Sequence, residues 1–226
     1  ECPFGDTTSG LSDMLVYMNG LTLYYRVGGT SLAWTNALSS ALTNQKWCNI
    51  VITRNGASAK LYLNSTFVSE QTLTGGDITA AVQVDRIGAS SAGTPAFYIN
   101  GKMSNIALFT SELSEDQILT IYNGGVPNDI SSLSPVSWWS LAGDSYYNGT
   151  NWICPDLGSS SNNGTSANMA GTELVGDGPG STANGIATSM DIPANLQGNA
   201  PNSSKNAFSI NMTEIDRVSG SGNVPG

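Results

Sequence analysis

The chain has 226 residues, of which 39% are hydrophobic and only 11% are charged, with 26 Gly and a net charge of −9. The low charged fraction and the many Gly, Ser, Thr and Asn residues favour an all-β protein with polar turns over a helical one. The eight Lys and Arg residues are scattered, so we expect no nucleic-acid binding, and no apolar run approaches the roughly 18 residues of a membrane span.

Short alternating strands are expected through the first part of the chain. Residues 14–29 predict two strands joined at Asn19-Gly20, a dipeptide that tolerates positive φ at both central positions of a hairpin turn. Residues 47–64 predict a second hairpin, whose turn begins at Asn55. Its first strand has two faces, with Cys48, Ile50 and Ile52 on one and Trp47, Val51 and Thr53 on the other. The further strands that we expect are 82–89, 95–103 and 105–110.

One helix is expected directly after residue 114. Ser114 and Gln117 have the spacing of a capping box, in which each side chain bonds the other residue's backbone N–H. Gly124-Gly125 and then Pro127 are typical of a helix end. The residues expected to form the buried stripe of this helix are Ile118, Leu119, Ile121 and Tyr122.

Residues 129–163 form a second stretch, which is rich in aromatic residues and broken by turns. Two interpretations stay open. Either the aromatic side chains pack this segment against the preceding domain, or exposed rings form a platform that stacks on sugars. The candidate contact residues for a glycan or a partner protein are Trp138, Trp139, Tyr146, Tyr147 and Trp152.

Residues 164–226 are expected to form an extended tail that is rich in Gly, Asn and Ser, with a repeat of about 22 residues. Each repeat offers so few apolar residues that burial within it cannot offset the entropy of ordering it. We therefore expect the tail to lie on another surface, such as a neighbouring subunit. Residues 206–212 are a candidate strand. The matching positions are Met169 and Met190, Leu174 and Leu196, and Pro179 and Pro201.

Four patterns within residues 47–125 together resemble laminin-G-like, concanavalin A-like domains: W..IVITR.G..AKLYLN, RIGA, F.INGKMSNIALF and LSEDQILTIYNGG. The resemblance implies a jelly-roll β-sandwich over residues 1–128, with the helix packed beneath a sheet. The family's opening strands normally take up more sequence before Trp47, so we expect some N-terminal strands to be missing or supplied by another chain. Many relatives carry Asp where this chain has Asn105, which weakens a calcium role there.

The continuation PNDISSLSPVSWWSLAGDS is similar to the C-terminal part of laminin-G-like structural proteins of marine bacteriophages. This similarity implies a virion component, such as a head fibre, decoration or appendage protein, at the virion surface or outside a cell. The partners that it implies are further copies of the chain and other virion proteins. The alternative function is a lectin-like module that binds carbohydrate on a host surface.

Enzymatic activity is not expected. The chain has no His, which removes the usual hydrolytic triad and most zinc ligands. No pair of Glu residues has the spacing that would place two carboxylates on one face, as in a glycosidase, and capping explains Glu112 and Glu115 beside the helix start.

No cofactor is expected either, although calcium stays open, because Asp77, Asp85, Asp144 and Asp156 lie near turns. Three cysteines do not define a disulfide framework. Cys48 is expected to be a small buried side chain. Pairing of Cys2 with Cys154 is left open, because spacing alone cannot show it.

Overall fold

The computed structural model describes residues 4–5, 14–39, 47–76, 86–89, 98–141, 144–166, 169–172 and 178–179. The chain divides into two compact units: a first unit of residues 1–103 and 111–118, and a second unit of residues 104–110 and 119–226. The candidate strand 206–212 and the repeats beyond residue 179 lie outside the described residues.

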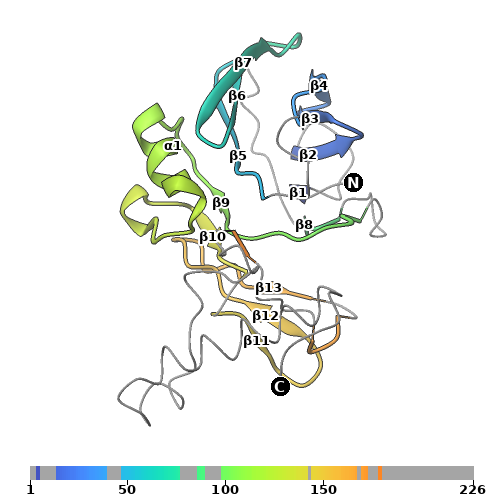
Figure 1. Ribbon diagram of the computed structural model, residues 1–226, viewed down its shortest axis with the longest axis vertical. Helices are drawn as coiled ribbons and strands as arrows, with labels where there is room; N and C mark the ends of the chain where they lie inside the picture. The colour runs from blue at the N-terminus through green and yellow to red at the C-terminus, as the bar shows by residue number, and fades with distance from the viewer. Residues whose placement is uncertain are drawn as a thin grey trace, which may run out of the picture. The chain divides into compact units, whose positions relative to one another are not determined.

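The first unit contains two antiparallel sheets (Figure 1). The larger sheet has the strand order β4-β3-β2-β1-β8 and the smaller one the order β5-β6-β7. The strands of the larger sheet are β1 (Phe4–Gly5), β2 (Met14–Asn19), β3 (Thr22–Val27), β4 (Thr30–Trp34) and β8 (Arg86–Ile87). Those of the smaller sheet are β5 (Ile50–Asn55), β6 (Ser58–Leu63) and β7 (Thr66–Thr72).

Alternate residues of both sheets contribute to one hydrophobic core, as expected when sheets pack face to face. Cys48, Ile50 and Ile52 all pack against this core, which agrees with the prediction that they share one face. Burial raises the pKa of the half-buried Cys48 thiol to about 11. The all-β sandwich with one short helix is therefore confirmed. The buried strand residues of the core are Leu23, Tyr25, Val27, Leu32, Trp34, Ala59, Leu61 and Leu63.

The first hairpin turns one residue later than expected. Asn19 pairs with Thr22, so Gly20 and Leu21 form the loop, and of these four residues only Gly20 has a positive φ, of 58°. Glycine at the first loop position is the pattern of a type II′ turn, whose twist matches that of the flanking strands. The prediction that Asn19 and Gly20 both occupy the turn centre is wrong.

Two other strand predictions also differ from the structure. Strand β4 was not expected, although Gly28 and Gly29, with φ of 55° and 80°, make the two-residue turn that leads into it. Of the strand expected at 95–103, the described residues 98–103 are irregular, so that prediction is wrong there. Within 82–89, strand β8 covers only two residues of the described part.

The β6–β7 loop offers a test of backbone strain. Asn64 and Ser65 both have positive φ, of 50° and 62°, a conformation that costs a residue with a side chain more than it costs glycine. We expect Ser65→Gly to raise the free energy of unfolding by about 0.5–1 kcal/mol. Ser69→Gly, in the middle of β7, should lower it by a similar amount. Urea unfolding of both variants checks the prediction, and a destabilised Ser65→Gly chain would contradict it.

The helix α1 (Glu115–Tyr122) begins at the predicted capping box. The Gln117 N–H donates to Ser114 Oγ at 3.3 Å, and the Ser114 N–H donates to Gln117 Oε1 at 2.9 Å. The helix ends in the short 3-10 turn η1 (Asn123–Gly125), where Gly124 has a φ of 66°. No helix among the described residues is long and apolar enough to cross a membrane.

The buried stripe of α1 is narrower than predicted. Ile118 is fully buried, and Ile121 and Tyr122 are half-buried. Leu119 is 57% exposed, so its predicted burial is wrong. Successive helix residues lie about 100° apart, which turns Leu119 away from the face that residues 118, 121 and 122 share.

The second unit contains two small antiparallel sheets and the 3-10 turn η2 (Ser131–Leu133). Strand β9, which was expected in the preceding sandwich, pairs here with β10, so that Trp138 lies opposite Ala107. The two strands of the first sheet are β9 (Ile106–Leu108) and β10 (Ser137–Trp139). The strands of the second sheet are β11 (Tyr146–Tyr147), β12 (Trp152–Cys154) and β13 (Gly164–Thr165).

Candidate functional site

Two of the five candidate aromatic residues, Trp138 and Trp139 on β10, are buried. The Trp138 indole N–H donates to Asn105 Oδ1 at 2.7 Å, and the Trp139 indole N–H donates to the Asn162 carbonyl at 2.9 Å. Buried indoles need such partners, and both have them. These two rings contribute to packing inside the second unit and present no open face to a ligand.

Asp156 organises the polypeptide around these tryptophans. It is 8% exposed, and its Oδ1 accepts the N–H of Trp138 at 2.7 Å and that of Gly158 at 2.9 Å. Its Oδ2 accepts the Asn162 N–H at 2.9 Å. Burial raises the pKa of this carboxyl, but hydrogen bonds from the three backbone N–H groups outweigh burial, and the net pKa is lowered.

The acidic residues proposed for calcium do not gather in the described part of the chain. Asp156 is occupied by backbone N–H groups, and Asp144 accepts a short hydrogen bond from the Ser140 hydroxyl. Asp77 and Asp85 lie outside the described residues. Where the structure describes the chain, no group of three or more acidic, Cys or His residues could hold a metal ion.

The other three candidate aromatic residues lie on the β11–β12 hairpin. Tyr147 pairs with Trp152, and their rings contact each other with centroids 5.8 Å apart and planes tilted by 55°. Tyr146 pairs with Ile153 and, because strand residues alternate, lies on the opposite face. Tyr146 is 55% exposed, Tyr147 is 39% exposed, and Trp152 is half-buried. This hairpin therefore carries the accessible aromatic surface of the second stretch.

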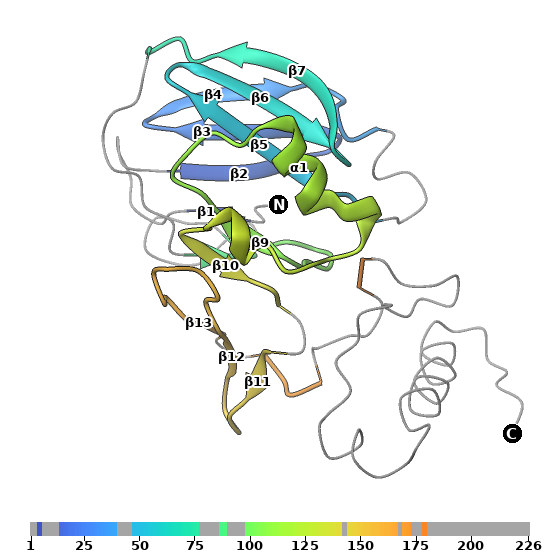
Figure 2. The same cartoon turned by 90° about the vertical axis from the view of Figure 1, so that its left-hand side faces the viewer.

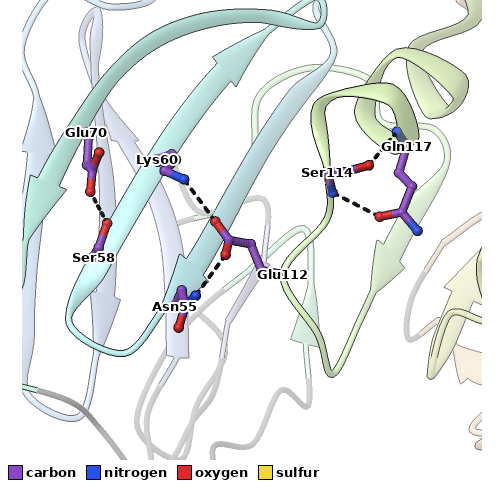
Figure 3. A network of polar contacts seen from close by, with 7 residues as sticks. All are labelled: Asn55, Ser58, Lys60, Glu70, Glu112, Ser114 and Gln117. Atoms are coloured by element: carbon purple, nitrogen blue, oxygen red, sulfur yellow. Dashed lines mark hydrogen bonds and ion pairs between the residues drawn. The ribbon is translucent and has the colours of Figure 1, made fainter.

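A polar pocket in the first unit was not predicted. Its centre is Glu112, whose Oε1 lies 3.1 Å from Lys60 Nζ and whose Oε2 accepts a hydrogen bond from Asn55 Nδ2 at 3.0 Å (Figure 3). These two hydrogen bonds lower the pKa of Glu112, and the one with Lys60 has the larger effect. The space beside them measures about 340 Å³. The residues that line it are Lys60, Tyr62, Glu112, Leu113, Ser114 and Glu115.

This polar cluster fastens residues 111–118 to the face of the smaller sheet that points away from the core (Figure 2). Both oxygens of Glu112 are engaged by the sheet, so the capping role predicted for Glu112 is wrong. Lys60 and Glu112 are 52 positions apart, and no local pattern indicates that they meet. Since Lys60 and Glu112 pair with each other, the pocket is explained by the attachment of residues 111–118 to the sheet.

Two antiparallel sheets around one core define the first unit as a β-sandwich of the concanavalin A-like class. Residues 4–119 match a laminin G family that is described as the concanavalin A-like lectin/glucanases superfamily. The chain belongs to this family.

Among solved structures, the chain is similar to part of an S-layer domain-containing protein from Clostridium thermocellum, at 20% identity and a TM-score of 0.29. The similarity covers 54% of this chain and 62% of that chain, so this chain spans about three fifths of the structure it matches. No curated protein matches the chain.

Proposed function

We propose that this chain is a non-catalytic structural protein of a virus particle, which acts by assembling with further copies of itself and with other virion proteins at the particle surface. Support comes from the similarity of its continuation after residue 125 to structural proteins of marine bacteriophages. The low charged fraction of 11% and the absence of His also favour assembly over catalysis.

The observation that carries this proposal is the edge strand β7. Among the described strands, β7 pairs only with β6, and an edge strand presents unpaired backbone groups that another chain can use. Phe67 is 48% exposed and Val68 is 40% exposed. The register with β6 shifts here, since Leu61 pairs with Ser69 and Tyr62 with Phe67, which leaves Val68 without an opposite residue.

The remainder of β7 is protected against pairing with another strand. Glu70 adds a charge, which disfavours edge-to-edge contact. Its carboxylate accepts a hydrogen bond from the Ser58 hydroxyl. Gln71 Nε2 donates to the Ala33 carbonyl on β4 at 2.6 Å, which connects the edges of the two sheets. The bulge at Val68 also disfavours backbone pairing, so we place the contact between copies on the exposed side chains of Phe67 and Val68 at the start of β7.

A charge at this position should separate the copies. We expect the full chain to be oligomeric at micromolar concentration, and Val68→Lys to raise the dissociation constant about tenfold or more, because a charge would be buried without a partner. Leu21→Lys is the matched control, since Leu21 is 43% exposed in the β2–β3 loop of the same unit. Sedimentation velocity measures both. A monomeric full chain, or an equal effect of both substitutions, would contradict the proposal.

Carbohydrate binding is the second candidate function. It is favoured by the exposed tyrosines of the β11–β12 hairpin, and by a family whose description includes lectins. We expect the full chain to bind a subset of glycans on an array of host-type polysaccharides. Signals at background level across such an array would remove this candidate and leave the assembly role standing.

A further inference from the structure

We propose that a neutral polysaccharide binds one face of the β11–β12 hairpin, through the rings of Tyr147 and Trp152. The proposal rests on the second candidate function, carbohydrate binding. It places the binding site in the second unit, outside residues 4–119, which match the laminin G family.

The hairpin presents its two tyrosines in opposite directions. Tyr147 lies beside Trp152 and shares its face, whereas Tyr146 lies beside Ile153 on the other. The tilted Tyr147–Trp152 pair offers adjacent aromatic surface of the kind that packs against the C–H groups of a sugar ring. On the opposite face Tyr146 has no aromatic cross-strand partner, so the two faces differ in what they can bind.

Residues 170 and 171 hold the two rings in place. The Trp152 indole N–H donates to the Ala170 carbonyl at 2.8 Å, which fixes the orientation of the indole. Gly171 approaches the Tyr147 ring so closely that a Cβ on it would lie 3.2 Å from Tyr147 Cδ1. Rings that are positioned before binding lose little side-chain entropy when a ligand arrives, and this favours affinity.

The hairpin that carries the rings is itself uncharged. No charged residue occurs in the hairpin sequence YYNGTNWI, residues 146–153. The Asn148 side chain orders the turn by accepting the N–H groups of Thr150 and Asn151, at 3.0 and 2.9 Å. Amide and hydroxyl groups beside aromatic rings suit a ligand with many hydroxyls, and the net charge of −9 disfavours a polyanion.

The test uses the full chain and soluble neutral polysaccharides, with xyloglucan and galactomannan as the probes in addition to the best array ligand. We expect Tyr147→Ala to weaken binding about tenfold or more, as loss of a stacking ring does elsewhere. Tyr146→Ala, which removes an equally large and more exposed ring from the other face, should change affinity less than about twofold. Trp152→Phe keeps an aromatic ring without the bond to Ala170, and should weaken binding less than Tyr147→Ala.

The outcomes distinguish an error in the proposed binding site from an error in the proposed carbohydrate-binding function. If the full chain binds and Tyr147→Ala binds equally well, the site is wrong and carbohydrate binding stands. If the full chain binds none of the probes, both the proposed site and carbohydrate binding are wrong. If Tyr147→Ala changes the oligomeric state and leaves glycan affinity intact, this face contacts a second copy, and the proposal is overturned. Near-ultraviolet circular dichroism of each variant shows that a loss of binding does not come from unfolding.

Discussion

Asp156→Ala is expected to lower the free energy of unfolding of the second unit by about 3–5 kcal/mol. Three backbone N–H groups lose their acceptor, the buried one of Trp138 and the partly buried ones of Gly158 and Asn162, and an unsatisfied buried group costs about 1–3 kcal/mol before the chain relaxes. Asp156→Asn keeps one acceptor oxygen and should cost less. Asp129, which is exposed and accepts the N–H of Ser131, provides the control, and Asp129→Ala should cost below about 1 kcal/mol.

Hydrogen exchange measured by mass spectrometry can show which region loses stability in Asp156→Ala. In Asp156→Ala, amides of β10 and of residues 156–162 should exchange faster, whereas amides of β3 and β6 in the first unit should keep their rates. Equal unfolding free energies for Asp156→Ala and Asp129→Ala would show that the carboxylate does not organise this segment.

The same carboxylate makes the second unit sensitive to acid. Its folded-state pKa is lowered, so the stabilisation that it supplies is present above the unfolded-state pKa of about 3.9 and is lost as the pH falls through the folded value. We expect the difference in urea midpoint between wild type and Asp156→Asn to be largest near neutral pH and to shrink below about pH 4. A difference that stays constant down to the most acidic folded sample would contradict this assignment.

Gly158→Ala is expected to destabilise the second unit by about 3 kcal/mol or more, because there is no space for a methyl group. A Cβ on Gly158 would lie 2.6 Å from the Cα and 2.8 Å from the N of Ser137, and 2.8 Å from the carbonyl carbon of Val136. All three are backbone atoms, which cannot rotate away. The Leu157 N–H donates to the Trp138 carbonyl at 2.7 Å, and the Ser160 N–H donates to the Val136 carbonyl at 2.9 Å. These hydrogen bonds hold residues 157–160 against residues 136–138.

Gly101→Ala is the matched control for this substitution, because a Cβ on Gly101 meets nothing within 4 Å and its φ is not in the left-handed region. It should change stability by less than about 0.5 kcal/mol. Thermal unfolding followed by tryptophan fluorescence compares the two variants. Coincident transitions for Gly158→Ala and Gly101→Ala would exclude the close approach of residue 158 to β10.

The two functional proposals can be tested separately because they use different surfaces. Assembly is assigned to Phe67 and Val68 on β7 of the first unit, and glycan contact to Tyr147 and Trp152 on the hairpin of the second unit. Val68→Lys should therefore leave glycan affinity per chain unchanged, apart from the loss of avidity that accompanies dissociation of an oligomer. Tyr147→Ala should leave the oligomeric state unchanged.

The sequence by itself determined the features that depend on neighbouring residues. Alternation placed Cys48, Ile50 and Ile52 on one common face, which the structure shows to be the face packed against the core, and the capping box placed the start of α1 directly after Ser114. These predictions succeed because strand alternation and helix capping involve residues only a few positions apart. The resemblance over residues 47–125 likewise indicated the sandwich that the family match over residues 4–119 confirms.

Only the tertiary structure decided which polar and aromatic side chains meet. Asp156 lies 18 positions from Trp138, and Glu112 lies 57 positions from Asn55, so composition and periodicity carry no sign of either contact. Trp138 is buried and Trp152 is only half-buried, although they are residues of the same type in one segment. Solvent exposure depends on what the rest of the chain packs against each ring, and no property of the ring or of its sequence neighbours specifies that.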